Sequence, residues 1–545
     1  KLPSTLKRID HRKLQGKVAI ITGASSGIGA ETALHFAKLG ANLTLVGRNE
    51  LRLRNVLMKC TILNPSIGVQ CVVADVSLEK NGEIIVAKTL EKFGQIDILI
   101  NGAGIIAVGS IETTNMEQFD TVMNTNLRAI YNITMLAVPH LIKTKGAIVN
   151  ISSITGMRAF PGVLAYCISK AAVDQFTRSI ALELGPKGVR VNSVNPGVVI
   201  TEIHKTGGMN DKQYQEFLER TKVTHALGRK MSNSILFKLQ NIPFYITKYI
   251  IFILLFRILF IILLIERISK HRKKKIDHRK MQGKVAIITG ASSGIGAETA
   301  LHFAKLGANL TLVGRNELRL KNVLTKCTIL NPSIGVQCVV ADVSLEKNGE
   351  IIVAKTLEKF GQIDILINGA GIIAVGSIET TNMEQFDTVM NTNLRAIYNI
   401  TMLAVPHLIK TKGAIVNISS VNGMRAFPGV LAYCISKAAV DQFTRSIALE
   451  LGPKGVRVNS VNPGVVITEI HKTGGMNDKQ YQEFLERTKV THALGRPGEV
   501  NEVAEAIAFL ATSKSSSFIT ATNLPVDGGR HAMVNLKNED NSFIY

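Results

Sequence analysis

The sequence predicts an α/β protein in which a doubly wound parallel sheet occurs twice, in two tandem and nearly identical domains. Residues 11–229 recur at 278–496 with an offset of 267 and five differences. Within each copy, short β-rich runs alternate with helical patterns of ten or more residues, which is typical of a parallel sheet with helices on both faces. A glycine-rich turn joins the first of these runs to the first helix.

The repeat divides the chain of 545 residues into two whole domains, because its period is far too long for a solenoid. We expect a first domain, a linker, a second domain and a tail at 14–229, 230–276, 277–535 and 536–545. The differences between the copies are Leu14/Met281, Arg54/Lys321, Met58/Thr325, Ile154/Val421 and Thr155/Asn422. Copies this similar are expected to share one fold and one chemistry wherever both are complete.

The first domain is truncated at its C-terminal end. The second copy continues past Arg496 to Asp527-Gly528-Gly529, whereas the first stops matching at Arg229. The first copy therefore lacks the last helix and the last strand. An unpaired sheet edge and exposed core side chains would follow, and they favour misfolding.

The first predicted strand, 18–22, runs into a glycine turn and then into a helix at 30–39. Strand, glycine turn and helix together form the arrangement that binds a dinucleotide pyrophosphate. Gly23 permits the tight turn, Gly27 lets the backbone approach a phosphate, and Gly29 packs the helix on the sheet. The placement between strand and helix makes this signal stronger than a glycine turn alone.

The second predicted strand, 42–47, ends in Arg48. An acidic residue there would hold the ribose 2′-hydroxyl of NAD, whereas an arginine suits a 2′-phosphate. This favours NADP, with NAD as the alternative if Arg48 simply lies in solvent.

Further strands are predicted at 69–74, 96–100, 147–152 and 190–194. Asp75, Asn101 and Ser153 follow three of them directly. Ligands of such sheets bind beyond the carboxyl ends of the strands, so these side chains are expected near one cleft. Residues 202–227 lie where a substrate lid would sit, and we expect His204 in it to be a surface or packing residue.

Ser153 precedes Tyr166 by thirteen residues, and Lys170 follows that tyrosine by four. Residues four apart share a helix face, so the phenol and the ammonium would point into the same cleft. A phenol with a pKa near ~10 is a poor acid or base at pH 7. A neighbouring ammonium would bring that pKa toward the working range, while the serine hydroxyl holds the oxygen that gains or loses charge. The pattern predicts proton transfer at a carbonyl or an alcohol, and it recurs at Ser420, Tyr433 and Lys437.

Charge and cysteine content exclude other classes of protein. The net charge is +23, but 230–276 holds ten Lys/Arg against one Glu, and the rest is spread without a basic stripe. This argues against nucleic-acid binding. The six cysteines show neither a CxxC pair nor metal-ligand spacing, so reduced thiols and no metal are expected. The first residues have no apolar core of a signal peptide, which favours a cytoplasmic location.

This ordered set of motifs resembles the short-chain dehydrogenase/reductase family, whose domains are of the Rossmann type. Within the family it looks most similar to the 3-oxoacyl-carrier-protein reductases. The resemblance implies that Tyr166 is the general acid/base, that Ser153 orients the substrate, and that Lys170 binds ribose and lowers the pKa of the tyrosine. It implies that Asn126 holds a water of a proton relay and that Thr201 binds the nicotinamide carboxamide.

The implied catalytic residues are Asn126, Ser153, Tyr166 and Lys170 in the first copy and Asn393, Ser420, Tyr433 and Lys437 in the second. The implied cofactor-binding residues of the first copy are Gly23, Ser25, Gly27, Ile28, Gly29, Arg48, Asp75, Val76, Asn101 and Thr201. Those of the second copy are Gly290, Ser292, Gly294, Ile295, Gly296, Arg315, Asp342, Val343, Asn368 and Thr468. The usual double asparagine is Asn101-Gly102 here, and Ala521 stands where the last strand often has glycine. Family members form dimers or tetramers, so the resemblance also implies a homo-oligomer through the second copy.

The linker contains a borderline membrane span at 249–265, apolar at sixteen of seventeen positions with Arg257 near its middle. As a helix it reaches only ~25 Å against a ~30 Å hydrocarbon core. A single span would also place two nearly identical domains on opposite sides of a bilayer. We therefore favour two neighbouring duplicated genes read as one chain, with 230–276 an unspliced segment and Met281 a natural start.

The sequence thus predicts an oxidoreductase that prefers NADP(H) and interconverts a small carbonyl compound and a secondary alcohol, with the second copy as the competent unit. Two alternatives remain open. One is a nucleotide-binding scaffold in which an inactive first copy only pairs with the second. The other is a reductase of lipid or steroid type, anchored to a membrane through 249–265.

Overall fold

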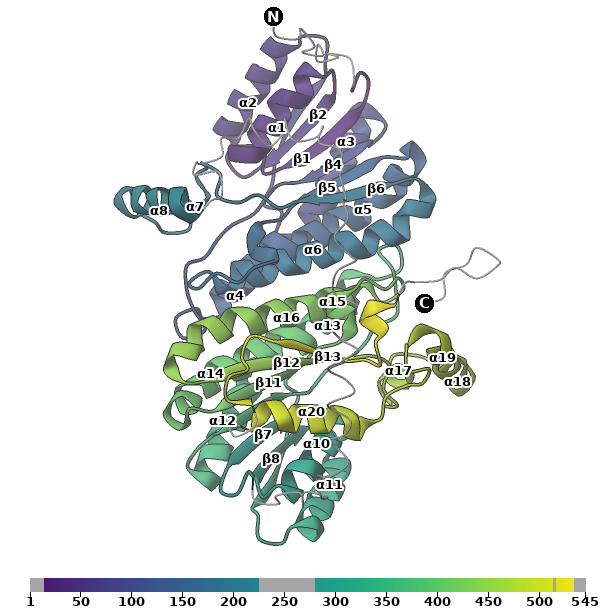
Figure 1. Ribbon diagram of the computed structural model, residues 1–545. Coiled ribbons are helices and arrows are strands. Elements are labelled where there is room, and N and C mark those ends of the chain that lie inside the picture. Colours follow the sequence, from purple (N-terminus) through teal and green to yellow (C-terminus); the bar gives the residue numbers. More distant parts are fainter. Residues whose placement is uncertain (1–13, 225–279, 513–515, 534–545) are drawn as a thin grey trace, which may run out of the picture.

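The computed structural model describes residues 14–224, 280–512 and 516–533. The predicted linker, its apolar segment at 249–265 and the tail at 536–545 lie outside the described residues. Figure 1 shows two α/β domains stacked on one another, each a central sheet between layers of helices.

The first domain contains a six-stranded sheet, with neighbouring strands parallel and in the order β3-β2-β1-β4-β5-β6. Its strands are β1 (Val18–Thr22), β2 (Asn42–Gly47), β3 (Val69–Val73), β4 (Ile98–Asn101), β5 (Ala147–Ile151) and β6 (Arg190–Val194). Its helices are α1 (Gly27–Lys38), α2 (Glu50–Leu63), α3 (Glu79–Phe93), α4 (Met116–Met123), α5 (Ala129–Thr144), α6 (Leu164–Leu184), α7 (Ile203–Thr206) and α8 (Asp211–Thr224). A π-helical turn, Asn124–Arg128, joins α4 to α5.

The second domain repeats this sheet and adds a seventh parallel strand, in the order β9-β8-β7-β10-β11-β12-β13. Its strands are β7 (Val285–Thr289), β8 (Asn309–Gly314), β9 (Val336–Val340), β10 (Ile365–Asn368), β11 (Ala414–Ile418), β12 (Arg457–Pro463) and β13 (Asn523–Val526). Its helices are α10 (Gly294–Lys305), α11 (Glu317–Leu330), α12 (Glu346–Phe360), α13 (Met383–Met390), α14 (Ala396–Thr411), α15 (Val421–Met424), α16 (Leu431–Leu451), α17 (Ile470–Thr473), α18 (Asp478–Glu486), α19 (Thr488–Thr491) and α20 (Val500–Ala511). It also contains a π-helical turn at Asn391–Arg395 and short 3-10 turns at Gly452–Lys454 and Arg530–Ala532.

The predicted fold is confirmed: two tandem doubly wound parallel sheets, with strand order reversing between β1 and β4 and between β7 and β10. Strand positions agree to within two residues. The first helix begins at Gly27 instead of residue 30, because Ser26 adopts an extended conformation (φ −163°) and the last glycines of the turn already form the first helical turn.

The truncation of the first domain is visible at its sheet edge. Within the described residues β6 is the last strand of its sheet, whereas β12 pairs with β13. As a result Val194 on β6 is 36% exposed, while its counterpart Val461 on β12 is fully buried. The helix α20, which packs against α10, has no counterpart among the described residues of the first copy.

The two domains pack through equivalent surfaces, with α6 lying along α16 (Figure 1). The Tyr131 ring stacks on Phe386 at 4.2 Å between centroids, and its hydroxyl donates to the Thr381 carbonyl at 2.9 Å. The symmetric contact joins Tyr398 to Phe119 at 4.3 Å. Each contact occurs twice with the copies exchanged, which is the property of an isologous two-fold interface, here formed within one chain.

Candidate active site

The glycine turn of the second copy is shaped by backbone contacts that only glycine allows. Gly290 has φ +71°, and a Cβ there would lie 2.7 Å from the Gly369 carbonyl oxygen. A Cβ on Gly296 would lie 2.2 Å from the Gly290 carbonyl oxygen. The Ser293 side chain makes no capping hydrogen bond to α10, so it does not occupy the first N–H groups of that helix. Such a helix start suits a pyrophosphate. The first copy repeats this geometry at Gly23 and Gly29.

A cavity of about 700 Å³ opens beside this turn in the second copy. All of the residues predicted for this copy line it except Asn368 and Asn393. The lining residues among them are Gly290, Ser292, Gly294, Ile295, Gly296, Arg315, Asp342, Val343, Ser420, Tyr433, Lys437 and Thr468. The structure therefore brings the predicted cofactor residues and the predicted catalytic residues to one cavity.

The serine, tyrosine and lysine converge as the spacing predicts. Ser420 follows β11, and Tyr433 and Lys437 lie on the first two turns of α16. The Lys437 Nζ donates to the Ile418 carbonyl at 2.8 Å and lies 5.5 Å from the centre of the Tyr433 ring. Tyr433 and Lys437 are 9% and 3% exposed. The side chains that α16 contributes to the site are therefore shielded from water.

Burial controls the protonation of these groups. Desolvation raises the pKa of Tyr433 to about 12, although the hydrogen bond with Ser420 acts in the opposite direction. This shift is opposite to the lowering expected from the sequence, because the phenol is buried and the lysine amine points to a carbonyl instead. Desolvation also lowers the pKa of Lys437 to about 8. At pH 7 the tyrosine holds its proton and the lysine is mostly charged.

The segment that carries Ser420 is held by a buried pair that sequence reasoning missed. The Asn462 Nδ2 donates to the Ser420 carbonyl at 2.9 Å and to both carboxylate oxygens of Asp441 at 3.0 Å. Desolvation raises the pKa of Asp441 to about 6. In the first copy Asn195 and Asp174 make the equivalent contact. The available signal was an aspartate four residues after the lysine, on the same helix face.

Two of the five differences between the copies, Ile154/Val421 and Thr155/Asn422, lie beside the serine, and the second of them changes its hydrogen bonds. The Ser420 Oγ donates to the Asn422 Oδ1 at 3.1 Å and accepts from the Asn422 N–H at 3.2 Å. In the first copy Ser153 accepts the equivalent N–H from Thr155, whose side chain offers no amide oxygen. The copies therefore differ in the hydrogen bonding of the serine hydroxyl, which the near identity of their sequences did not suggest.

The two asparagines with predicted roles form hydrogen bonds within the protein, although the buried Asn368 Oδ1 has no partner among the described residues. The Asn393 side chain accepts from the Ile372 N–H and donates to the Ile372 carbonyl, both at 2.8 Å, from within the π-helical turn. Gly371 lies between this asparagine and Lys437. A Cβ added to Gly371 would lie 3.4 Å from the Asn393 Oδ1 and 3.5 Å from the Lys437 Nζ. The Asn368 Nδ2 donates to the Asn417 Oδ1 at 2.8 Å inside the sheet. Asn126 and Asn101 do the same in the first copy.

Arg315 follows β8 and reaches toward Asp342. Its Nη1 lies 3.8 Å from the Asp342 Oδ2, and 71% of its side chain is exposed. The other oxygen of Asp342 accepts from the Ser344 N–H at 2.9 Å. Arg48 and Asp75 are 3.7 Å apart in the first copy. The guanidinium therefore lies near the Asp342 carboxylate while most of its side chain faces solvent. It lines the cavity at the end of β8.

A tyrosine that the sequence did not single out fixes the loop of Thr468. The Tyr481 hydroxyl donates to the Thr468 carbonyl at 3.0 Å and accepts from its N–H at 3.3 Å. In the first copy Tyr214 donates to the Thr201 carbonyl at 3.0 Å.

His204 packs against Phe217 at 4.5 Å between ring centres, which confirms its expected packing role. No helix within the described ranges is long and apolar enough to cross a membrane.

Comparison with known proteins agrees with this site. The family model for short chain dehydrogenases matches residues 17–211, and that described as enoyl-(acyl carrier protein) reductase matches 290–531. The chain is similar to the meso-2,3-butanediol dehydrogenase of Serratia marcescens, 38% identical over 253 residues, which are 46% of this chain and 96% of the relative. It is also similar to the 3-oxoacyl-acyl-carrier-protein reductase of Thermotoga maritima, 37% identical over 251 residues, 46% of this chain and 98% of the relative. The L-xylulose reductase of Mesocricetus auratus is 34% identical over 251 residues, 46% of this chain and 97% of the relative.

The chain therefore belongs to the short-chain dehydrogenase/reductase family, as a tandem duplication. It is an NAD(P)-dependent oxidoreductase that acts on CH–OH groups and the corresponding carbonyls. The 3-oxoacyl-acyl-carrier-protein reductases are among its neighbours, as the sequence motifs predict.

The lowered pKa of Lys437 predicts the pH dependence of carbonyl reduction. The ammonium is present below about pH 8 and is lost as the pH rises through that value. We expect kcat/KM for reduction to fall above about pH 8, because the charge beside the Tyr433 phenol disappears. Asp441 raises the pKa of this lysine, so Asp441→Asn should move the fall to lower pH. A pH profile from 6 to 10 that stays flat, or that moves upward in Asp441→Asn, would contradict this assignment.

Proposed function

We propose that the second copy is a carbonyl reductase that prefers NADP(H), with Tyr433 as the proton donor. The observation that carries this proposal is the convergence of Ser420, Tyr433 and Lys437 with the glycine turn in one cavity of about 700 Å³. The glycine contacts and the open helix start fit a dinucleotide. Arg315 would take its 2′-phosphate and Thr468 its carboxamide.

The nicotinamide, when bound, supplies or accepts the hydride. The chain's own residues do the rest. Ser420 turns its hydroxyl hydrogen from the Asn422 Oδ1 to the substrate oxygen, and Tyr433 gives that oxygen its proton as the carbonyl becomes an alcohol. Lys437 stabilises the phenolate that remains, and its charge is effective because burial has removed water. Asn393 lies behind Gly371 and Lys437, where a proton relay would continue.

Replacing the phenol tests the proton donor. Tyr433→Phe in the full chain should lower kcat by about 10²–10⁴-fold, the usual contribution of a general acid, while NADPH binding by calorimetry stays within about twofold. Tyr166→Phe is the matched control in the incomplete copy and should change kcat little. Full activity of Tyr433→Phe would mean that the proton donor is misassigned.

The preference for NADP should depend on Arg315. Arg315→Asp should reduce the ratio of kcat/KM for NADPH over NADH by at least about tenfold, because a charge-assisted hydrogen bond is replaced by repulsion. Arg48→Asp, the same change in the first copy, should leave the ratio near the wild-type value. An unchanged ratio in Arg315→Asp would show that this arginine lies in solvent and does not contact the cofactor.

For the first copy we propose a supporting role, in keeping with a scaffold. The Gln175 Nε2 on α6 donates to the carbonyls of Asn422 and Arg425, both at 2.8 Å, in the segment that follows the catalytic Ser420. In the other direction, Gln442 donates to the Thr155 carbonyl at 2.8 Å. Each copy thus holds the serine segment of the other, and among the described residues only the second copy has the seventh strand.

This role predicts an asymmetric effect of two equivalent substitutions. Gln175→Ala leaves two carbonyls of the serine segment without their donor, and kcat of the full chain should fall by roughly tenfold. Gln442→Ala removes the mirror contact and should leave kcat nearly unchanged. Equal effects of the two variants on kcat, at equal thermal stability, would show that both copies carry the reaction.

A further inference from the structure

The second copy carries an arginine in its cavity that the reaction described above does not use. Arg530 begins the short 3-10 turn after β13 and lines the same cavity as Ser420 and Tyr433. Its side chain packs over Phe427, with the guanidinium carbon 4.8 Å from the ring centre. The residue is only 8% exposed. A guanidinium stacked in this way presents a planar fork of donors with little freedom to turn.

Within residues 14–224, 280–512 and 516–533, no carboxylate forms an ion pair with Arg530. The acid that lies nearest along the chain is already engaged: Asp527 accepts from the N–H of His531 at 2.6 Å and from the N–H of Gly529 at 3.1 Å. The His531 ring also lies 2.9 Å from this carboxylate. Burial lowers the pKa of Arg530 to about 10, which leaves it charged at pH 7. Asp527 acts on Arg530 through its charge without forming an ion pair with it, and Arg425 places a second positive charge nearby, so the site favours a further anion.

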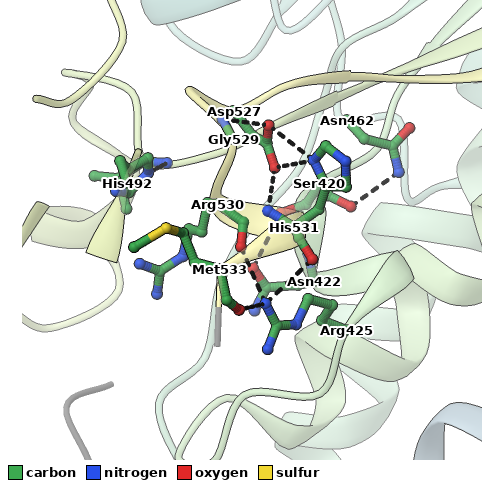
Figure 2. Close-up of polar contacts among 11 residues, drawn as sticks. Ser420, Asn422, Arg425, Asn462, His492, Asp527, Gly529, Arg530, His531 and Met533 are labelled. Carbon is green, nitrogen blue, oxygen red and sulfur yellow. Dashed lines mark hydrogen bonds and ion pairs between the residues drawn. The ribbon is translucent and has the colours of Figure 1, made fainter. Parts of the chain in front are cut away.

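The turn that carries Arg530 is tied to the catalytic serine segment, as Figure 2 shows. The Arg425 Nη1 donates to the carbonyls of Arg530 at 3.1 Å and His531 at 3.2 Å, and also to that of Met533. Arg425 follows α15, which begins directly after Ser420. The position of the Arg530 backbone is therefore set by the same segment that positions the serine.

These contacts also place Arg530 on the substrate side of the cavity. Its ring contact is with Phe427 and its backbone contact with Arg425, both between Ser420 and Tyr433 in the chain. The glycine turn, by contrast, approaches Gly369 and Thr468. The phosphates of a dinucleotide are assigned to the glycine turn and to Arg315, so Arg530 is left for a different anion.

We propose that Arg530 binds a negatively charged group of the substrate, a carboxylate or a phosphate, so that the second copy selects small anionic carbonyl compounds over neutral ones. This inference rests on the proposed function of the cavity. The first copy cannot make the same selection, because the matching sequence ends at Arg229, before the residues that form this turn.

The test compares matched pairs of substrates that differ only in charge. Oxo acids of four to six carbons are assayed beside their methyl esters, and dihydroxyacetone phosphate beside dihydroxyacetone, with NADPH and the full chain. For either the oxo acids and their esters or the phosphate and its parent alcohol, the wild type should prefer the charged compound by about ten- to hundredfold in kcat/KM. Arg530→Gln should abolish this preference while changing kcat/KM for the neutral members by less than about threefold. Arg530→Lys should retain part of the preference for the charged substrate. The kind of pair that shows this preference identifies the anion as a carboxylate or a phosphate.

Binding to the NADP⁺ complex, measured by calorimetry with the same oxo acids and with inorganic phosphate, gives a readout that does not need turnover. Neutral substrates reduced without any preference for charge would overturn the anion site and leave the reductase intact. Anions bound through Arg530 but never reduced would support the anion site and overturn the reductase. An equal loss for charged and neutral substrates in Arg530→Gln, or no anion binding by the wild type, would reduce Arg530 to a packing residue.

Discussion

The packing of α6 against α16 is the constraint on which the rest of this molecule depends. Each of these helices has one face on its own sheet and another on the equivalent helix of the other domain, so α16 is buried along most of its length. A helix that is buried all round needs partners on every side. The duplication supplies the partner within the same chain, and the first copy does so although the described part of its sheet lacks the seventh strand.

The same burial determines the chemistry. Because Tyr433 and Lys437 lie on the buried face of α16, desolvation favours their neutral forms and pushes their pKa values in opposite directions. The result is a protonated phenol beside an amine that is mostly charged at pH 7. In the proposed reaction this combination favours donation of a proton to a carbonyl oxygen, with a lysine that also bonds to the Ile418 carbonyl assisting the tyrosine.

Local patterns in the sequence were sufficient for the doubly wound parallel class of the sheets, the strand positions, the glycine turn and the spacing of the serine, tyrosine and lysine. The residues that the sequence did not reveal act over long separations. Gln175 and Asn422 are 247 residues apart, and Arg425 and Arg530 are 105 apart. Such contacts leave no periodicity in the chain, and Asn422 stood out only as one of five differences between the copies. The direction of the tyrosine pKa was missed for a related reason, since desolvation depends on packing that spacing does not report.

Hydrogen exchange of the full chain tests this account most directly. Peptides that span 151–158 and 418–425 differ in mass between the copies, so the two serine segments can be followed separately. If the cross-domain packing holds the reactive site in the second copy, the 418–425 amides exchange slowly and become slower still on addition of NADPH, more than those of 151–158. Rapid exchange of 418–425 that NADPH does not change, with protection confined to the first copy, would contradict the account.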